Sequence, residues 1–181
     1  MKNILDTLHN DHVNFIKLLA FIESEIDRIR KCELVDFETM LLCMKYMKEF
    51  PDAIHHPLEN IIFEYYLNHY DDHRDEINAL FHEHEEMPVL TEHILHMLQS
   101  VLAEEPISRD ALCENLSEYV DIQKSHMNHE ESVIYPVLYS KMKDIDWKAL
   151  HDLKEVSVDP LFGKNKKESY QSLFTIITAS I

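Results

Sequence analysis

Hydrophobic residues recur along most of the chain at intervals of three and four positions, the spacing of an amphipathic α-helix. Four long segments carry this period, with breaks of only a few residues between them. They are Lys2–Arg30, Asp36–Asn68, Asp75–Ala103 and a segment that follows the expected N-cap Ser108 and ends near Lys143. Because short connections make successive helices antiparallel neighbours, the pattern predicts an all-α fold, an up-down-up-down four-helix bundle.

The helical period weakens after residue 143. We expect a short helix at Asp146–Glu155, a turn at Asp159–Gly163 that contains the only glycine, and a last helix at Lys164–Ile181. The chain is therefore predicted to have two parts. Residues 1–143 form the bundle, and residues 144–181 form a helical extension that packs on it.

Polar residues interrupt the apolar stripes in a repeated way. Each half of the chain places one lone histidine on a stripe and, just over forty residues later, a His-x-x-x-Glu motif. The residues are His12 with His55 and Glu59 in the first half, and His84 with His126 and Glu130 in the second. The repeat suggests two helical hairpins related by a pseudo-two-fold axis, which suits a site that holds two metal ions.

The chemistry of these residues favours metal binding. Residues four apart on a helix share a face, so each motif aims an imidazole and a carboxylate into the core. A buried carboxylate must be paired, protonated or bound to a metal, because desolvation of the charge is costly. Four imidazoles and two carboxylates suit iron, manganese or zinc, and the absence of cysteine from the set disfavours a thiolate site.

Each residue also has a simpler interpretation. A lone histidine on an apolar stripe is more often a hydrogen-bonded core residue than a ligand, and His–Glu pairs four apart are common on helix surfaces. The coincidence of four such features, one on each helix, favours the metal site. Among the other histidines, His9 and His82 are the candidates for a fifth ligand, whereas His56 and His129 are expected at the surface or at a helix interface.

Composition narrows the partners. The formal charge is −17, from 17 basic and 34 acidic residues, which disfavours nucleic acid and anionic membranes as partners. No apolar run is long enough to span a bilayer and no leader opens the chain, so with three scattered cysteines we expect a cytoplasmic protein with reduced thiols. No phosphate-binding loop, dinucleotide fingerprint or nucleophile motif is present. Oligomeric state stays open, with a homo-oligomer possible.

The motifs resemble those of the haemerythrin-like, or HHE cation-binding, family over roughly residues 1–142. The resemblance is carried by Asn10-Asp11-His12, His55-His56-Pro57-Leu58-Glu59, Glu83-His84-Glu85-Glu86-Met87 and His126-x-x-x-Glu130-Glu131-x-x-x-x-Pro136. It implies two non-haem iron ions with an oxo or hydroxo bridge, and binding of O₂, NO or a related small oxidant. It further implies terminal ligands from the four histidines and bridging by the two glutamates.

Two departures from the oxygen carriers of that family matter. Those proteins have a second histidine four positions from the helix-three ligand, whereas the positions four before and four after His84 are Leu80 and Pro88 in this chain. They also have an aspartate five positions after the helix-four histidine. Here Glu130 comes at four, though Glu131 is at five. The set is more similar to members with four histidines and two glutamates, some of which are tied to repair of damaged iron centres.

Three functions remain open from the sequence. The first, which we favour, is a non-enzymatic protein that binds or senses a small ligand at a di-iron centre. The second is a di-iron oxidase or peroxidase, or a factor that repairs iron centres or delivers iron. The third is a metal-free structural bundle, which the repeated donors disfavour. One structural condition applies to all metal sites: the second helix must continue through Pro57, or His55 and Glu59 would not share a face.

Overall fold

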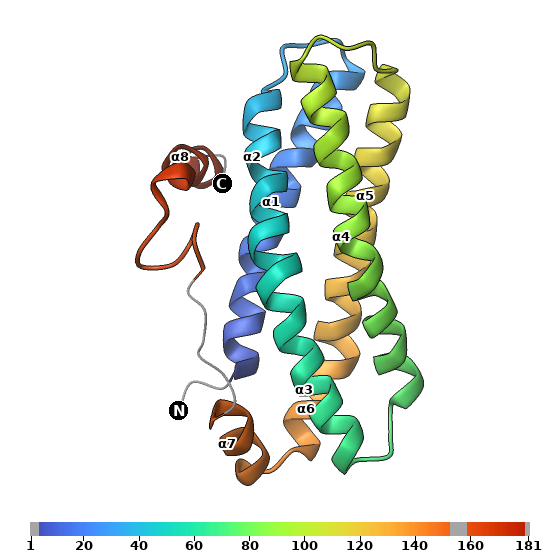
Figure 1. Cartoon of the computed structure of the whole chain (residues 1–181), viewed down its shortest axis with the longest axis vertical. Coiled ribbons are helices and arrows are strands. Elements are labelled where there is room, and N and C mark those ends of the chain that lie inside the picture. The colour runs from blue at the N-terminus through green and yellow to red at the C-terminus, as the bar shows by residue number, and fades with distance from the viewer. Residues whose placement is uncertain (1–3, 153–158, 180–181) are drawn as a thin grey trace.

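The computed structural model describes residues 4–152 and 159–179, and within these ranges it contains helices and turns but no strand. The prediction of an all-α fold is confirmed. Long helical rods lie side by side (Figure 1). In chain order the elements are α1 Ile4–Arg30, α2 Phe37–Met47, η1 Lys48–His55, α3 His56–His69, α4 Arg74–Leu102, α5 Arg109–His129, η2 Glu130–Ile134, α6 Tyr135–Lys141, α7 Asp144–Asp152, η3 Glu168–Tyr170 and α8 Gln171–Ala179.

Two rods are single helices, α1 and α4, and two are composite. In each composite rod a π-helical segment, η1 or η2, joins two α-helices without leaving helical backbone angles. The second predicted helix therefore continues through Pro57, as the site requires. Ser108 caps α5 as predicted, since its hydroxyl accepts a hydrogen bond from the backbone N–H of Ala111 at 3.3 Å. The predicted ends at Lys2, Glu155 and Ile181 lie outside the described residues.

The π-helical segments have a common local cause. At the end of η1 the N–H of His56 donates to the carbonyl of Pro51, five residues back, and Pro57 follows. At the end of η2 the N–H of Tyr135 donates to the carbonyl of Glu130, and Pro136 follows. A proline has no N–H to donate. In both rods the last hydrogen bond that spans five residues is made by the residue directly before the proline. The change back to α-helical bonding therefore falls at a residue that has no N–H to donate, and no further hydrogen bond is lost.

The second π-segment shifts the buried face of its rod by one residue. The sequence predicts that Val133 and Val137 continue the apolar stripe after Glu130. The structure instead buries Ile134 and Leu138 completely and leaves the two valines partly exposed. A π-turn closes over five residues rather than four, so each later side chain is rotated relative to a regular α-helix. The predicted stripe is wrong there for this reason.

Two apolar clusters fill the bundle, and a polar level separates them. One cluster lies toward the C-terminal end of α1 and includes Phe15, Met44 and Leu116. The other lies toward the N-terminal end of α1 and includes Leu8, Ile62 and Ile134. His12, between Leu8 and Phe15 in the sequence, marks the level of the polar residues. The apolar packing above and below excludes water from this level.

The two hairpin loops repeat the same backbone motif. Cys32 and Glu104, which follow α1 and α4, both adopt left-handed backbone angles, with φ of 57° and 59°. In each loop the next residue donates its N–H to a carbonyl five positions back: Glu33 to Arg28 at 3.0 Å, and Glu105 to Ser100 at 2.9 Å. This is a Schellman motif built without glycine. The internal repeat thus extends beyond the polar residues.

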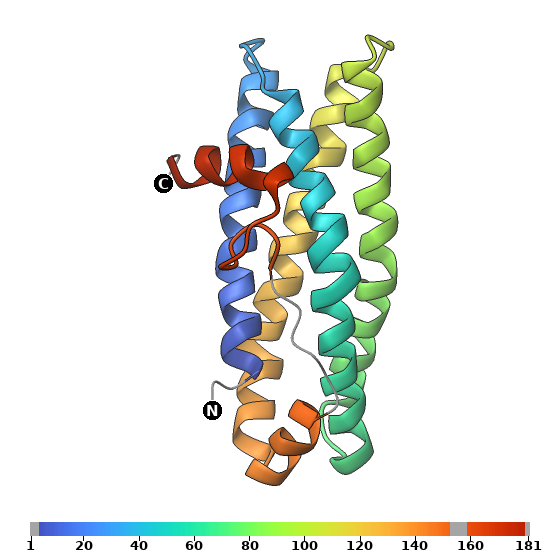
Figure 2. The ribbon, with the colours of Figure 1, turned by 60° about the vertical axis from the view of Figure 1, so that its left-hand side comes forward.

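The C-terminal segment contacts the bundle at two places (Figure 2). In α7, Asp146 accepts hydrogen bonds from the hydroxyls of Tyr65 at 3.0 Å and Tyr70 at 2.7 Å, which holds α7 against the end of α3. Further along, α8 lies across α1 and α2. The rings of Phe162 and Tyr170 both meet Tyr46 of α2 edge-on, with centroids 6.1 and 5.7 Å away. These contacts extend the first apolar cluster.

None of the helices that the structure describes combines the length and the apolarity needed to cross a membrane.

Candidate metal centre

The structure brings the six predicted polar residues together at one level inside the bundle. Their side chains are buried, with His84 6% exposed and the other five 3% or less. They come from every rod: His12 from α1, His55 and Glu59 from the junction of η1 and α3, His84 from α4, and His126 and Glu130 from the junction of α5 and η2. Both His-x-x-x-Glu motifs therefore span an α–π boundary. Unusual helical turns of this kind are frequent at functional sites.

The four histidines form two pairs, one in each hairpin. The Nε2 atoms of His12 and His55 are 2.9 Å apart, and those of His84 and His126 are 3.1 Å apart. In each pair the two Nε2 atoms converge on one point, although two neutral imidazole nitrogens can share only one proton. Convergent nitrogens at this separation are a suitable arrangement for ligands of one metal ion.

Glu59 reaches both histidine pairs. Its Oε1 lies 3.2 Å from Nε2 of His55 and 3.7 Å from Nε2 of His12. Its Oε2 lies 3.5 Å from Nε2 of His84 in the other pair. The two oxygens of one carboxylate thus face opposite halves of the centre.

Glu130 makes the same connection from the other side. Its Oε2 lies 3.3 Å from Nε2 of His12 and 3.3 Å from Nε2 of His126. Its Oε1 lies 3.5 Å from Nε2 of His84. Both glutamates therefore border both histidine pairs, which is the position a carboxylate needs in order to bridge two ions.

Three of these four carboxylate oxygens have no hydrogen-bond partner among the described residues: Oε2 of Glu59 and both oxygens of Glu130. Both side chains are fully buried. A buried carboxylate without hydrogen bonds is strongly unfavourable unless it is protonated or binds a cation. The orphaned oxygens and the convergent nitrogens both fit metal ions.

The outward-facing Nδ1 atoms have their own partners, which follow the repeat. Nδ1 of His55 donates to Asp11 at 3.1 Å, and Nδ1 of His126 donates to Glu83 at 2.6 Å. Each carboxylate comes from the residue directly before the lone histidine of the same hairpin. Such an outer hydrogen bond fixes the ring orientation and leaves Nε2 free as a ligand.

The lone histidines are held across the hairpins. Nδ1 of His12 donates to Glu131 at 2.8 Å, and Nδ1 of His84 donates to the amide oxygen of Asn60 at 2.6 Å. Both partners are the residues directly after the motif glutamates. None of the four outer partners was predicted from the sequence to orient a histidine. An acidic residue before each lone histidine and a polar residue after each motif glutamate were the available signals.

The charges at the metal-free centre show how strongly these groups interact. Burial by itself would lower the pKa of His55, but the carboxylates of Glu59 and Asp11 outweigh it and raise the pKa to about 9. Burial lowers the pKa of His84 to about 4, against the opposing effect of Glu59. Burial also lowers the pKa of His12, so the metal-free centre favours a protonated imidazole at His55 and neutral ones at His12 and His84.

The two glutamates also differ. Burial raises the pKa of Glu130 well above its usual value, and the neighbouring charge of Glu59 raises it further. Burial would do the same to Glu59, but the imidazoles of His55 and His84 lower its pKa well below the usual value. Two carboxylates in one dry site do not both ionise unless cations are present. Two bound metal ions would supply that charge.

The structure also places the spare histidines. His9 and His82, the candidates for a fifth ligand, have exposed side chains. His9 donates to Glu131 at 3.0 Å, so it touches an outer partner of His12, and His82 pairs with Glu86 on the surface. His56 is only 3% exposed. Of the two positions expected for His56, surface or interface, the structure shows the interface.

Tyr135 was also missed by the sequence analysis. Its hydroxyl donates to Oε1 of Glu59, and its ring stacks on His12 with centroids 5.6 Å apart. Tyr135 comes five residues after Glu130, and the π-turn between them is what turns both toward the centre. In a regular α-helix, residues five apart do not share a face.

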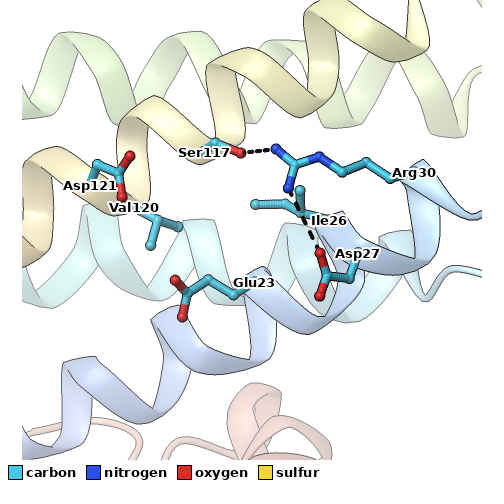
Figure 3. A pocket seen from close by; sticks show the side chains of 7 residues that line it. All are labelled: Glu23, Ile26, Asp27, Arg30, Ser117, Val120 and Asp121. Carbon is cyan, nitrogen blue, oxygen red and sulfur yellow. Dashed lines mark hydrogen bonds and ion pairs between the residues drawn. The ribbon is translucent and has the colours of Figure 1, made fainter.

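The surface grooves either lie away from the level of the six buried His and Glu residues or reach only the edge of that level. A groove of about 470 Å³ between α1 and α5 is lined by residues that include Glu23, Asp27 and Arg30, none of which belongs to the centre (Figure 3). A second cavity, of about 240 Å³ between α4 and α5, is lined in part by Glu83 and His126. It therefore meets the outer edge of the centre.

The helical fold and the converging donors define a cation-binding helical protein, with buried His/Glu groups that could hold metal. The sequence matches the family described as hemerythrin HHE cation binding domain over residues 3–139. The chain belongs to this family, as the resemblance of its motifs indicated. Comparison with curated proteins gives no match.

Proposed function

We propose that this protein holds a centre of two non-haem iron ions and binds or senses O₂, NO or a related small oxidant there. The ligands are His12, His55, His84 and His126, with Glu59 and Glu130 bridging, on an up-down-up-down bundle in the cytoplasm. The single observation that carries the proposal is the position of the two glutamates. Both are fully buried, and each lies within 3.7 Å of Nε2 atoms from both histidine pairs.

Iron is favoured over other metals by the donor set and the family together. Mixed imidazole and carboxylate ligands suit iron, manganese and zinc, and the membership of the HHE family adds the preference for iron. An iron centre of this kind supplies open coordination positions and redox chemistry for small ligands. The surrounding residues orient the donors and exclude water.

The chain's own residues perform three tasks in this proposal. The outer partners, such as Asp11 and Glu83, orient the imidazoles. The apolar clusters keep bulk solvent away from the bound ligand. The hydroxyl of Tyr135, which donates to Glu59, holds a proton beside a bridging carboxylate. A small anionic ligand could accept this hydrogen bond only in place of Glu59, because the hydroxyl has one proton to donate.

The test is metal analysis followed by spectroscopy. Protein from iron-replete cells should contain about two iron ions per chain, and azide or NO added to it should produce saturable, reversible absorption changes. Finding one ion or none after careful anaerobic purification would contradict the di-iron proposal. Turnover of an oxidant, rather than a stable adduct, would favour an enzyme.

A second candidate is an iron-delivery or repair factor. One observation favours it: the cavity between α4 and α5 meets Glu83 and His126, so an ion has a short route to solvent. The discriminating measurement is the rate at which a chelator removes iron. Fast transfer of iron to the chelator at neutral pH would favour delivery. Glu83→Gln should change the rate of this transfer at least tenfold, and Asp27→Asn should not.

A further inference from the structure

Three tyrosines gather at the end of the bundle where α3, α6 and α7 meet (Figure 1). Tyr65 and Tyr66 lie in the last turns of α3, and Tyr70 follows directly after the helix. Each hydroxyl donates to a carboxylate: Tyr66 to Asp72, and Tyr65 and Tyr70 to the two oxygens of Asp146. The rings of Tyr66 and Tyr70 stack, with centroids 4.8 Å apart and planes 12° apart. Two phenols, each with a carboxylate partner, are therefore in direct ring contact.

Tyr66 connects this end of the bundle to the metal centre. It follows Glu59 by seven residues on α3, so the two side chains share a face and lie about 10 Å apart along the helix axis. Tyr66 is fully buried and belongs to the same apolar cluster as Tyr135, whose hydroxyl reaches Glu59. Tyr70 is only partly buried. Buried rings thus lead from the centre to a residue at the surface.

The carboxylate partners give these tyrosines a specific chemical capacity. A phenol that loses an electron becomes a strong acid, so its proton must leave at the same time. Asp72 already accepts the hydrogen bond of Tyr66 and can take that proton without any movement. The Asp72 side chain is 39% exposed and also pairs with Lys141 at 3.1 Å, so the proton can exchange with solvent. Burial and Asp72 raise the pKa of Tyr66, which keeps the phenol protonated until it is oxidised.

The opposite side of the centre has a tyrosine without this arrangement. Tyr119 precedes His126 by seven residues, the same spacing as that between Glu59 and Tyr66. It is 2% exposed and lies in the other apolar cluster. Its hydroxyl faces the hydroxyl of Thr91 at 3.4 Å. A hydroxyl is a much weaker base than a carboxylate, so Tyr119 has a poorer acceptor for its proton and serves as an internal comparison.

We propose that Tyr66 and Tyr70 form a path for single electrons from the surface to the centre, so that the protein oxidises small one-electron donors with hydrogen peroxide. This inference rests on the proposed function, because the peroxide reacts at the iron ions. The donor itself never enters the bundle. It meets Tyr70 at the surface, and only electrons cross the buried distance.

The step balances with peroxide as the oxidant. The O–O bond breaks, and two electrons with two protons convert one peroxide into two molecules of water. Tyr66 and Tyr70 each supply one electron and become tyrosyl radicals, and their phenolic protons pass to Asp72 and Asp146. The same number of protons enters the new water molecules from solvent. Each radical then regains one electron from a small reductant such as ascorbate, and its proton returns from the carboxylate.

The test looks for the radical directly. Full-length protein with two iron ions per chain, mixed with hydrogen peroxide and frozen, should show an organic radical by electron paramagnetic resonance. Ring-deuterated tyrosine should narrow the signal, which identifies a tyrosyl radical. Tyr66→Phe should lower both the signal and the rate of ascorbate oxidation at least tenfold. Tyr119→Phe is the matched control, since it removes an equally buried hydroxyl at the same spacing, and should change neither. Zinc-loaded protein should give no radical.

Asp72→Asn separates proton acceptance from a merely structural hydrogen bond. The amide oxygen still accepts a hydrogen bond from Tyr66 but is a much weaker base, so the radical signal should fall while the melting temperature stays unchanged. A wild type that binds two iron ions but forms no tyrosyl radical would overturn the inference. So would equal signals in Tyr66→Phe and Tyr119→Phe. A wild type that binds fewer than two iron ions would instead contradict the proposed function.

Discussion

The two helical hairpins, residues 4–69 and 74–141, present the same inner donors but surround them differently. In the first hairpin's pair, both Nδ1 atoms donate to carboxylates, those of Glu131 and Asp11. In the second pair one partner is a carboxylate, Glu83, and the other is the neutral amide of Asn60. A carboxylate makes the imidazole a stronger electron donor than an amide does.

In the proposed centre, the repeat would place the metal ions and the outer residues would set their properties. Two ions would need equivalent positions, which the pseudo-symmetric inner donors provide. The outer partners are under no such constraint.

The largest effect should come from the residues that serve both halves. Glu59→Gln and Glu130→Gln each remove an anionic donor that borders both histidine pairs, so each variant should lose at least one of the two ions. Metal at a hundred times its dissociation constant stabilises a fold by about 3 kcal/mol. For a chain of this length that corresponds to roughly 5–10 °C in melting temperature.

Elemental analysis and thermal melts of these variants measure both quantities. His9→Ala and His129→Ala are the controls and should keep the metal. Hydrogen exchange at residues 55–62 and 126–133 should rise in metal-free wild-type protein. Equal metal content in all four variants would show that the glutamates are not shared ligands.

A smaller effect should distinguish the two halves. Asp11→Asn and Glu83→Gln each replace the carboxylate that orients one histidine of a motif, His55 or His126. Each change should weaken one ion by about 10–100-fold and leave the other nearly unchanged. Chelator competition gives the affinities, and ¹⁵N spectra of the zinc form identify the affected side. Asp27→Asn, a surface carboxylate on α1, serves as the control. If both variants weakened the same ion, the assignment of one histidine pair to each ion would be wrong.

The metal-free protein should show opposite pH dependences for one imidazole of each half, His55 and His84. The pKa of His55 is raised to about 9, so its stabilising contribution is complete below pH 6.5 and is lost as the pH rises toward 9. The pKa of His84 is lowered to about 4, so the fold loses stability as the pH falls from 6.5 toward 4.

Urea unfolding of the metal-free protein across this range gives the free energy of unfolding. His55→Gln should flatten the alkaline side of the profile, and His84→Gln should flatten the acidic side. NMR titration of the two imidazoles provides the direct check. Titration of both rings near pH 6.5 would mean that the halves do not differ in this way.

The smallest effect should come from His9. Its side chain is 57% exposed, and it reaches the centre only through its hydrogen bond to Glu131, which already binds His12. Exposed pairs of this kind contribute little. His9→Ala should change the affinity of the first ion by less than about threefold in chelator competition. A loss of tenfold or more would make His9 part of the centre.

Local patterns in the sequence were enough to predict the six polar residues that meet at one level of the core. A buried stripe of period 3.6 and the cost of burying polar groups are local properties, so His12, His84 and the two His-x-x-x-Glu motifs could be predicted. The helical fold and the Ser108 cap followed from the same local rules. Proline at 57 was correctly judged compatible with a continuous helix, although the π-segment that accommodates it could not be foreseen.

The tertiary structure alone decided the rest, because it depends on rotation and on neighbours. One π-turn rotates every later side chain of its rod, which brings Tyr135 to the centre and replaces Val133 by Ile134 in the core. The outer partners act across helices, as Glu131 does on His12, so no pattern within one helix contains them. His56 was placed by the packing of α3 against α4, since a residue beside the predicted face is buried only where a neighbouring helix covers it.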